Sequence, residues 1–156
     1  MPHSYNKIWV PAIWATKHRQ HYITPHIERK VYDFIYKQFT DLGCVISAIN
    51  GMPDHIHCLF LLNPNKSISD VIKQVKGSTS NFVNQEKLIE DHFSWQTGYA
   101  TFSVSESVLE RVYHYIKNQK EHHRKKNFQD EYDGFLKLYG LLENNINHNF
   151  NRGNQL

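Results

Sequence analysis

Residues 50–60 read NGMPDHIHCLF, a turn sequence followed by a run of apolar residues. The segment GMPD at 51–54 combines glycine, proline and aspartate, which favour a tight turn. Residues 55–62 after the turn are typical of a buried strand, and the run CVISAIN at 44–50 before it is rich in β-forming residues. The sequence therefore predicts a hairpin of two antiparallel strands.

Helical spacing of apolar residues appears on both sides of this hairpin. Upstream, Thr24 followed by Pro25 predicts the start of a helix that continues to Gly43. Downstream, Ser67 predicts the cap of a second helix, in which Gly77 is expected to weaken the helix and to shape its end. The two helices would pack their apolar stripes on the sheet.

The remaining elements extend the same pattern. Residues 8–15 predict a strand, placed near a sheet edge or carrying a bulge because Pro11 interrupts it. Residues 93–103 predict an irregular strand or a ligand-contacting loop. A third helix is expected from a Ser105 cap through Gln119 into the basic cluster 120–126, and a short one over 128–142.

This order of elements predicts an α+β fold, an antiparallel sheet with helices packed on it. The length of 156 residues suits one domain, which we expect to span 1–143, with a loose asparagine-rich tail at 144–156. The hydrophobic content of 40% provides enough apolar surface for one core, and the formal charge of +3 permits binding to nucleic acid.

The chain has two cysteines, Cys44 and Cys58, and no CxxC element. This excludes a disulfide-dense scaffold and a cysteine-rich zinc site, and it favours a reducing compartment. The sequence has no apolar run long enough for a signal peptide or a membrane span. We therefore expect a soluble cytoplasmic protein with no membrane partner.

The pair His55 and His57 is the first candidate site. Alternate residues of a strand point to the same face, so both imidazoles are aimed at one point, as in half of a metal site. Spacing alone leaves open that they are ordinary strand histidines. Asp54 before them could orient an imidazole, or it could simply form the turn.

Tyr115 and Gln119 on the third helix are the second candidate pair. Their i, i+4 spacing places them one above the other on one helical face, beside His122 and outside the core stripe. Tyr113 belongs to the core stripe and points in a different direction. Spacing alone favours the ordinary roles, because tyrosines on helices usually pack and glutamines are usually solvated.

Taken together, HIH at 55–57 and YIKNQKEHH at 115–123 resemble the HUH-superfamily single-tyrosine transposases of the smallest bacterial insertion sequences and their REP-associated relatives. The resemblance includes WATKHR at 14–19, SISDVIKQVKGSTS at 67–80 and SWQTGYATFSVS at 94–105. The set is specific, although each motif alone is weak. It implies the ferredoxin-like or RRM-like fold of HUH endonucleases.

The resemblance also implies roles for individual residues. His55, His57 and Gln119 match the metal ligands, Tyr115 matches the nucleophile, and Mg²⁺ or Mn²⁺ suits these nitrogen and oxygen donors. The family cleaves and rejoins single-stranded DNA at hairpin-bearing element ends through a 5′-phosphotyrosine. It acts as a homodimer in which the tyrosine helix of one chain can complete the site of the other.

Basic and aromatic residues are candidates for DNA contacts. They are Lys17, Arg19, Lys73, Lys76, Trp95, His122 and Arg124. For most of them, solvated lysines and packed aromatics are the ordinary alternative. Lys76 stands out because the KGSTS segment at 76–80 matches the family and its small residues could let the backbone approach a phosphate.

Three other functions remain open at the level of sequence. A domesticated relative would bind or process dispersed hairpin repeats without moving its own gene. A binding module would hold single-stranded nucleic acid without chemistry. A different HxH metalloenzyme, such as a cupin, is disfavoured because it would need an all-β pattern and this chain has long amphipathic helices.

Overall fold

The computed structural model describes residues 4–123 and residue 130. The chain divides into two compact units, Met1–Lys120 and Glu121–Leu156, and the sheet lies in the first. The predicted helix at 128–142, the tail at 144–156 and the domain end at 143 fall outside the described residues, apart from residue 130. No helix among the described residues is long and apolar enough to cross a membrane.

The four strands form one antiparallel sheet. They are β1 (Trp9–Ala15), β2 (Val45–Met52), β3 (His55–Leu61) and β4 (Ala100–Thr101). Their order across the sheet is β2-β3-β1-β4, so β3 and β1 are the central strands. With helix α1 (Pro25–Asp41) between β1 and β2, and α2 (Ile68–Gln85) between β3 and β4, this is the predicted ferredoxin-like arrangement.

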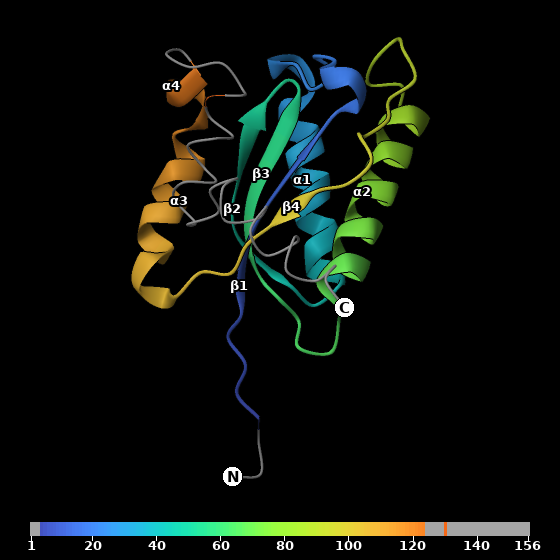
Figure 1. The fold of residues 1–156 in the computed structure, drawn as a ribbon. Coiled ribbons are helices and arrows are strands. Elements are labelled where there is room, and N and C mark those ends of the chain that lie inside the picture. The colour runs from blue at the N-terminus through green and yellow to red at the C-terminus, as the bar shows by residue number, and fades with distance from the viewer. Residues whose placement is uncertain (1–3, 124–129, 131–156) are drawn as a thin grey trace, which may run out of the picture. The chain divides into compact units, whose positions relative to one another are not determined.

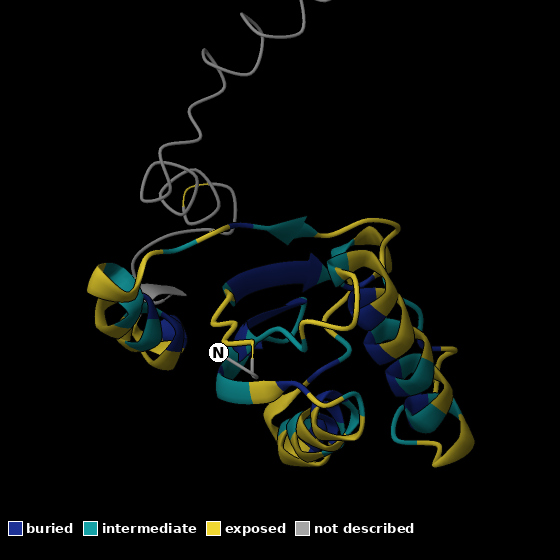
Figure 2. Cartoon of the chain, turned by 90° about the horizontal axis from the view of Figure 1, so that it is seen from below, coloured by how far each residue is buried: buried dark blue, intermediate teal, exposed yellow. Residues whose placement is uncertain are grey.

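The main core lies between the sheet and the helices α1 and α2, which cover one of its faces (Figure 1). The sheet and α1 supply buried apolar side chains to it, namely Val10, Ala12, Trp14, Ile56, Cys58, Phe60, Ile27, Val31, Ile35 and Phe39. Burying each large one contributes about 1.5–3 kcal/mol. Figure 2 shows that buried residues are concentrated in the central strands and on the inner sides of the helices, whose outer surfaces are exposed.

Helix α3 (Leu109–Lys117) packs against the opposite face of the sheet, where it contacts β2 and β3 (Figure 1). Its buried side chains are Val112 and Ile116. Because alternate residues of β3 face opposite sides, Ile56 and Cys58 enter the main core while His55 and His57 face α3. The helix thus covers the face that carries the two histidines.

Two predictions about the first half of the chain can be compared with the structure. Strand β1 lies near a sheet edge, as predicted, because its neighbour on that side is the two-residue strand β4, which pairs with it only at Ala12 and Ile13. Pro11 is tolerated because its backbone faces the side of β4, just beyond the last register pair, Ala12–Thr101. Its carbonyl accepts a 3.1 Å hydrogen bond from the backbone N–H of Phe102, and its missing N–H would face the same side. Helix α2 does not end at Gly77 but continues to Gln85, since packing of its apolar stripe outweighs the weak helix propensity of one glycine.

The predicted third helix is not continuous. Ser105 makes no side-chain cap, and the chain first forms a 3₁₀ turn, η2 (Glu106–Val108), before α3 begins at Leu109. The helix then breaks at Asn118, whose φ and ψ are −94° and 15°, and a short helix α4 (Gln119–His123) follows. Tyr115 and Gln119 therefore do not share one unbroken helical face.

Candidate active site

The histidine pair lies on the central strand β3, opposite Met52 and Asn50 on β2 and Ala15 and Ile13 on β1. Both imidazoles have exposed fractions of 0%. Their ring centroids are 5.2 Å apart, with an angle of 75° between the planes. Hydrogen bonding to neighbours on both sides fixes the backbone of this strand, so the two side chains are held at a constant separation.

The turn before the pair is pinned to the rest of the molecule. A Cβ atom at Gly51 would overlap the carbonyl oxygen of His55, so this close approach of two backbones requires glycine. The Pro53 carbonyl accepts a hydrogen bond of 2.9 Å from the backbone N–H of Ile23. The Asp54 carbonyl accepts one of the same length from Thr16. The NGMPD segment thus fixes the start of the histidine strand.

Asp54 contacts one of the histidines directly. Its Oδ1 lies 2.7 Å from Nδ1 of His55, and its Oδ2 accepts a 2.9 Å hydrogen bond from Nη2 of Arg19. Burial by itself raises the pKa of Asp54, but hydrogen bonds from His55 and Arg19 and the charges of these side chains outweigh burial and hold the pKa well below its usual value. The ionised carboxylate therefore favours the tautomer in which Nδ1 carries the proton, and Nε2 is then the nitrogen that would coordinate a cation.

Arg19 reaches Asp54 from a strained turn. The 3₁₀ turn η1 (Lys17–Arg19) has left-handed backbone at two residues other than glycine, His18 with φ 54° and Arg19 with φ 57°. Such conformations cost about 1–3 kcal/mol each. The Thr16 hydroxyl donates a hydrogen bond of 2.6 Å to the Gln20 carbonyl and holds the turn closed. From this turn the Arg19 guanidinium reaches the Asp54 carboxylate.

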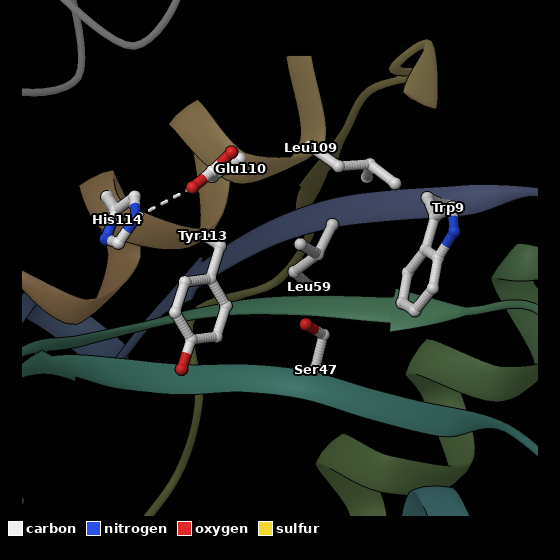
Figure 3. Close-up of a pocket in the computed structure, with 7 residues that line it drawn as sticks. All are labelled: Trp9, Ser47, Leu59, Leu109, Glu110, Tyr113 and His114. Atoms are coloured by element: carbon white, nitrogen blue, oxygen red, sulfur yellow. Dashed lines mark ion pairs between the residues drawn. The ribbon is translucent and has the colours of Figure 1, made fainter. Parts of the chain in front are cut away.

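Tyr115 lies against the second histidine. Its ring centroid is 6.0 Å from that of His57, edge to face at 75°. Tyr113 points elsewhere, as the sequence predicted, and lines a pocket of about 400 Å³ with Leu59, Trp9 and other residues (Figure 3). Of the two tyrosines, the structure thus brings Tyr115 to the histidines and Tyr113 to the neighbouring pocket.

Its polarity favoured a solvated position for Gln119 beside the core stripe, but the side chain is fully buried. It follows Val112 and Ile116 at spacings of four and three residues, so it lies on the same buried face as they do. Within residues 4–123, neither its amide oxygen nor its amide nitrogen has a hydrogen-bond partner. A buried amide in this state is costly unless a ligand satisfies it.

The donor chemistry of these side chains fits a divalent cation. The described part of the chain contains no group of three or more His, Cys, Asp and Glu side chains placed to hold a metal ion. Two imidazoles on β3 therefore need a further donor of another kind, and the buried amide oxygen of Gln119 is of the required type. A set of nitrogen and oxygen ligands suits Mg²⁺ or Mn²⁺.

The residues predicted to contact DNA are not all in the same situation. Lys17 and Lys73 are exposed. Lys76 and Trp95 make hydrogen bonds within the protein. The Lys76 ammonium donates to the carbonyl of Gln96 at 2.9 Å and to that of Gly98 at 2.7 Å. The Trp95 indole donates to the Lys76 carbonyl at 3.0 Å. His122 and Arg124 lie outside the part of the chain whose side chains are described.

Two contacts of the site were not anticipated from the sequence. Arg19 was expected at DNA but is paired with Asp54. Asn50 stands opposite His57 and donates to the Lys117 carbonyl next to the helix break. Strand alternation could have placed Asn50 on the histidine face. The direction of Arg19 depends on a left-handed turn that the sequence KHR does not announce.

Known proteins share this architecture. The sequence matches the family described as "Transposase IS200 like" over residues 4–119. A curated relative, the ISDra2 transposase TnpA of Deinococcus radiodurans, is 26% identical over 114 residues, which cover 70% of this chain and 81% of the relative.

Two solved structures are similar. A crystal structure described as a transposase from Deinococcus radiodurans R1 has a TM-score of 0.61 at 26% identity. The match covers 76% of this chain and 95% of the chain in that structure. A REP-associated tyrosine transposase bound to a REP hairpin has a TM-score of 0.58 at 16% identity, covers 79% and 73%, and supports the fold. From its sequence match and its fold, this chain belongs to the IS200-like family of transposases, the single-tyrosine branch of the HUH superfamily.

Proposed function

We propose that this transposase cleaves and rejoins single-stranded DNA at hairpin-bearing ends, with Tyr115 as nucleophile and with His55, His57 and Gln119 as ligands of a divalent cation. The observation that carries the proposal is the position of the Tyr115 ring, 6.0 Å from that of His57 on the buried histidine face. The proposed site draws two imidazoles from β3, a phenol from α3, and from the start of α4 a buried amide that has no hydrogen-bond partner among the described residues.

The reaction is a transesterification at phosphorus. The Tyr115 oxygen forms a bond to the phosphorus and loses its proton, while the bond from phosphorus to the 3′ oxygen breaks and that oxygen leaves as a 3′ hydroxyl. The product is a 5′-phosphotyrosine. Because the phosphoester bond is conserved, a 3′ hydroxyl from a second strand can reverse the step and reseal DNA without a nucleotide cofactor.

The residues of the proposed site have separate tasks in this step. A phenol has a pKa near 10 and is a poor nucleophile at neutral pH, so position and electrostatics must supply most of the rate. Asp54 would hold the His55 ring in one tautomer, and burial of both imidazoles would exclude competing water. When bound, Mg²⁺ or Mn²⁺ supplies Lewis-acid stabilisation of the charge that develops on the phosphate oxygens.

The proposed DNA partner is a hairpin with single-stranded flanks. One structural neighbour is a REP-associated tyrosine transposase bound to a REP hairpin, which supports this substrate class for a chain of the same fold. The formal charge of +3 and the exposed Lys17 and Lys73 provide for phosphate contacts. We further propose that the chain works as a homodimer, as the family does.

Incubation of the purified protein with labelled hairpins from the flanks of its own gene tests this function. The reactions contain Mn²⁺, Mg²⁺ or EDTA and are run on a denaturing gel. We expect a covalent protein–DNA adduct that forms with either metal and is absent with EDTA. Hairpin binding without an adduct in any metal would contradict cleavage and favour a domesticated or purely binding protein, and an adduct in EDTA would contradict the metal.

A further inference from the structure

The break between α3 and α4 is held by side chains that no part of the mechanism above uses. The Nδ2 of Asn50 donates a 2.9 Å hydrogen bond to the carbonyl of Lys117, one residue before the break. The Oδ1 of the same side chain accepts a hydrogen bond of 3.1 Å from Nζ of Lys120, two residues after the break. One amide on β2 thus holds both sides of the break.

Lys120 extends this network to two other elements. Its ammonium donates to the carbonyl of Gly51 at 3.0 Å and pairs with Oε2 of Glu28 on α1 at 2.8 Å. It also lies 5.9 Å from the centre of the Tyr32 ring. The backbone N–H of Gly51 in turn donates a hydrogen bond of 2.9 Å to the Asn50 side chain, so the side-chain amide of Asn50 is fixed in one orientation. We call Asn50 and Lys120 the clasp.

We propose that the clasp is a positioning device that holds Gln119 toward the histidine pair and so sets the affinity of the site for its divalent cation. This rests on the proposed function, in which Gln119 is the third protein ligand. Gln119 lies between the two clasped positions, Lys117 and Lys120. Asn50 is also the register partner of His57, so the clasp ties the two sources of ligands together.

Helix phase brings Gln119 to the buried side, since it follows Val112 and Ile116 at helical spacing. Its amide makes no hydrogen bond among the described residues, so no polar contact of its own holds the side chain in place. The Lys117 carbonyl accepts from Asn50, and Asn118 leaves helical geometry directly after it. The contacts of the clasp with β2 and α1 therefore hold the backbone on both sides of Gln119.

A double-mutant cycle on Mn²⁺ affinity separates positioning from general stability. The proteins are wild type, Asn50→Ala, Gln119→Ala and the double variant, with Mn²⁺ binding measured by titration of the free ion in electron paramagnetic resonance. If Asn50 acts through Gln119, each single variant loses about tenfold in affinity and the double variant loses no more than Gln119→Ala alone. Losses that multiply would overturn the proposal.

Variants of Lys120 provide an independent test if thermal melts show that Asn50→Ala is poorly folded. Lys120→Met removes the ammonium and keeps the apolar stem, while Lys120→Arg retains a cation for Glu28. We expect the Met variant to lose Mn²⁺ affinity and the Arg variant to recover part of it. The control is Lys37→Met, which also breaks a lysine–carboxylate ion pair, here with Asp41 at 3.2 Å on the exposed face of α1. Equal losses in Lys37→Met and Lys120→Met would overturn the clasp.

The outcome also separates the clasp from the function on which it rests. Wild-type protein that binds no Mn²⁺ would contradict the proposed ligand set, and the clasp with it. Wild-type protein that binds Mn²⁺, combined with unchanged affinity in Asn50→Ala and Lys120→Met, would contradict the clasp alone.

Discussion

The carboxylate of Asp54 lies 2.7 Å from Nδ1 of His55, with its second oxygen 2.9 Å from the guanidinium of Arg19. The three side chains form a line from a surface turn to the buried histidine face. A metal-binding imidazole commonly has a carboxylate on its second nitrogen, which fixes the ring and raises its basicity. This geometry gives Arg19 an indirect role in the site.

Arg19→Met is expected to weaken Mn²⁺ binding. Removal of the guanidinium leaves Asp54 with one partner fewer and lets the carboxylate rotate away from His55. We expect a loss of up to about tenfold in metal affinity, at the lower end of the range for outer partners of metal ligands. Calorimetric titration with Mn²⁺ measures it.

Lys17→Met is the matched control, because Lys17 belongs to the same turn but is exposed. It should leave Mn²⁺ affinity unchanged and lower only hairpin affinity, with a shallower dependence on salt concentration. If Arg19→Met behaved in the same way as Lys17→Met, Arg19 would be a DNA contact and not a support for Asp54.

Gly51→Ala should destabilise the fold, because a methyl group at this position would overlap the backbone carbonyl of His55 and neither backbone can yield easily. We expect a loss of about 2 kcal/mol or more in the free energy of unfolding, measured by urea denaturation. A variant as stable as wild type would show that the hairpin can relax, and that its tight geometry does not fix the histidine strand.

Gly77→Ala should have the opposite effect. Gly77 lies inside helix α2, and a Cβ atom there would meet nothing within 4 Å. We expect a gain of about 0.5–1 kcal/mol in the free energy of unfolding. Hairpin affinity should stay the same, because backbone N–H groups inside a helix are already bonded; a clear fall in affinity would instead support close approach of the DNA backbone to this glycine.

Lys76→Met should loosen the segment around Trp95. The ammonium of Lys76 bridges the carbonyls of Gln96 and Gly98, so the variant should lose about 1–2 kcal/mol in the free energy of unfolding. We expect an unchanged slope of hairpin affinity against salt, since the charge is engaged within the protein. A shallower slope would make Lys76 a direct phosphate contact.

The difference in stability between wild type and Lys76→Met is expected to depend on pH. Burial lowers the pKa of Lys76, so its native state binds the proton less tightly than the unfolded chain does. Stability contributed by Lys76 is therefore greatest above the unfolded pKa of about 10.4 and falls as the pH drops through the lower native pKa. The difference in stability between wild type and Lys76→Met should grow as the pH is raised toward that value.

Local sequence patterns were sufficient for most of the fold. The NGMPD turn predicted the hairpin, the alternation of β3 predicted that His55 and His57 share a face, and helical spacing predicted α1 and α2. In each case neighbouring residues carry the information, through turn geometry or the period of the element. The resemblance of the motifs to a family then predicted the sheet and its helices as a whole.

Tertiary contacts decided what the sequence could not predict. The break at Asn118 accompanies a hydrogen bond from Asn50, a residue far away in the sequence, to the Lys117 carbonyl. The pairing of Arg19 depends on a turn stabilised by Thr16 and by the Asp54 backbone. Neither can be read from local propensity, because the partners meet only after the sheet has formed. Both details bear directly on the site.

The assignment of Tyr115 as nucleophile is the central claim, and the two nearby tyrosines of α3 allow a direct test. Wild type, Tyr115→Phe and Tyr113→Phe are incubated with a 5′-flank hairpin in Mn²⁺, and the covalent adduct is digested and mapped by mass spectrometry. We predict a phosphotyrosine at Tyr115, no adduct in Tyr115→Phe and a normal yield in Tyr113→Phe. An adduct that persists in Tyr115→Phe, or that maps to Tyr113, would contradict the account.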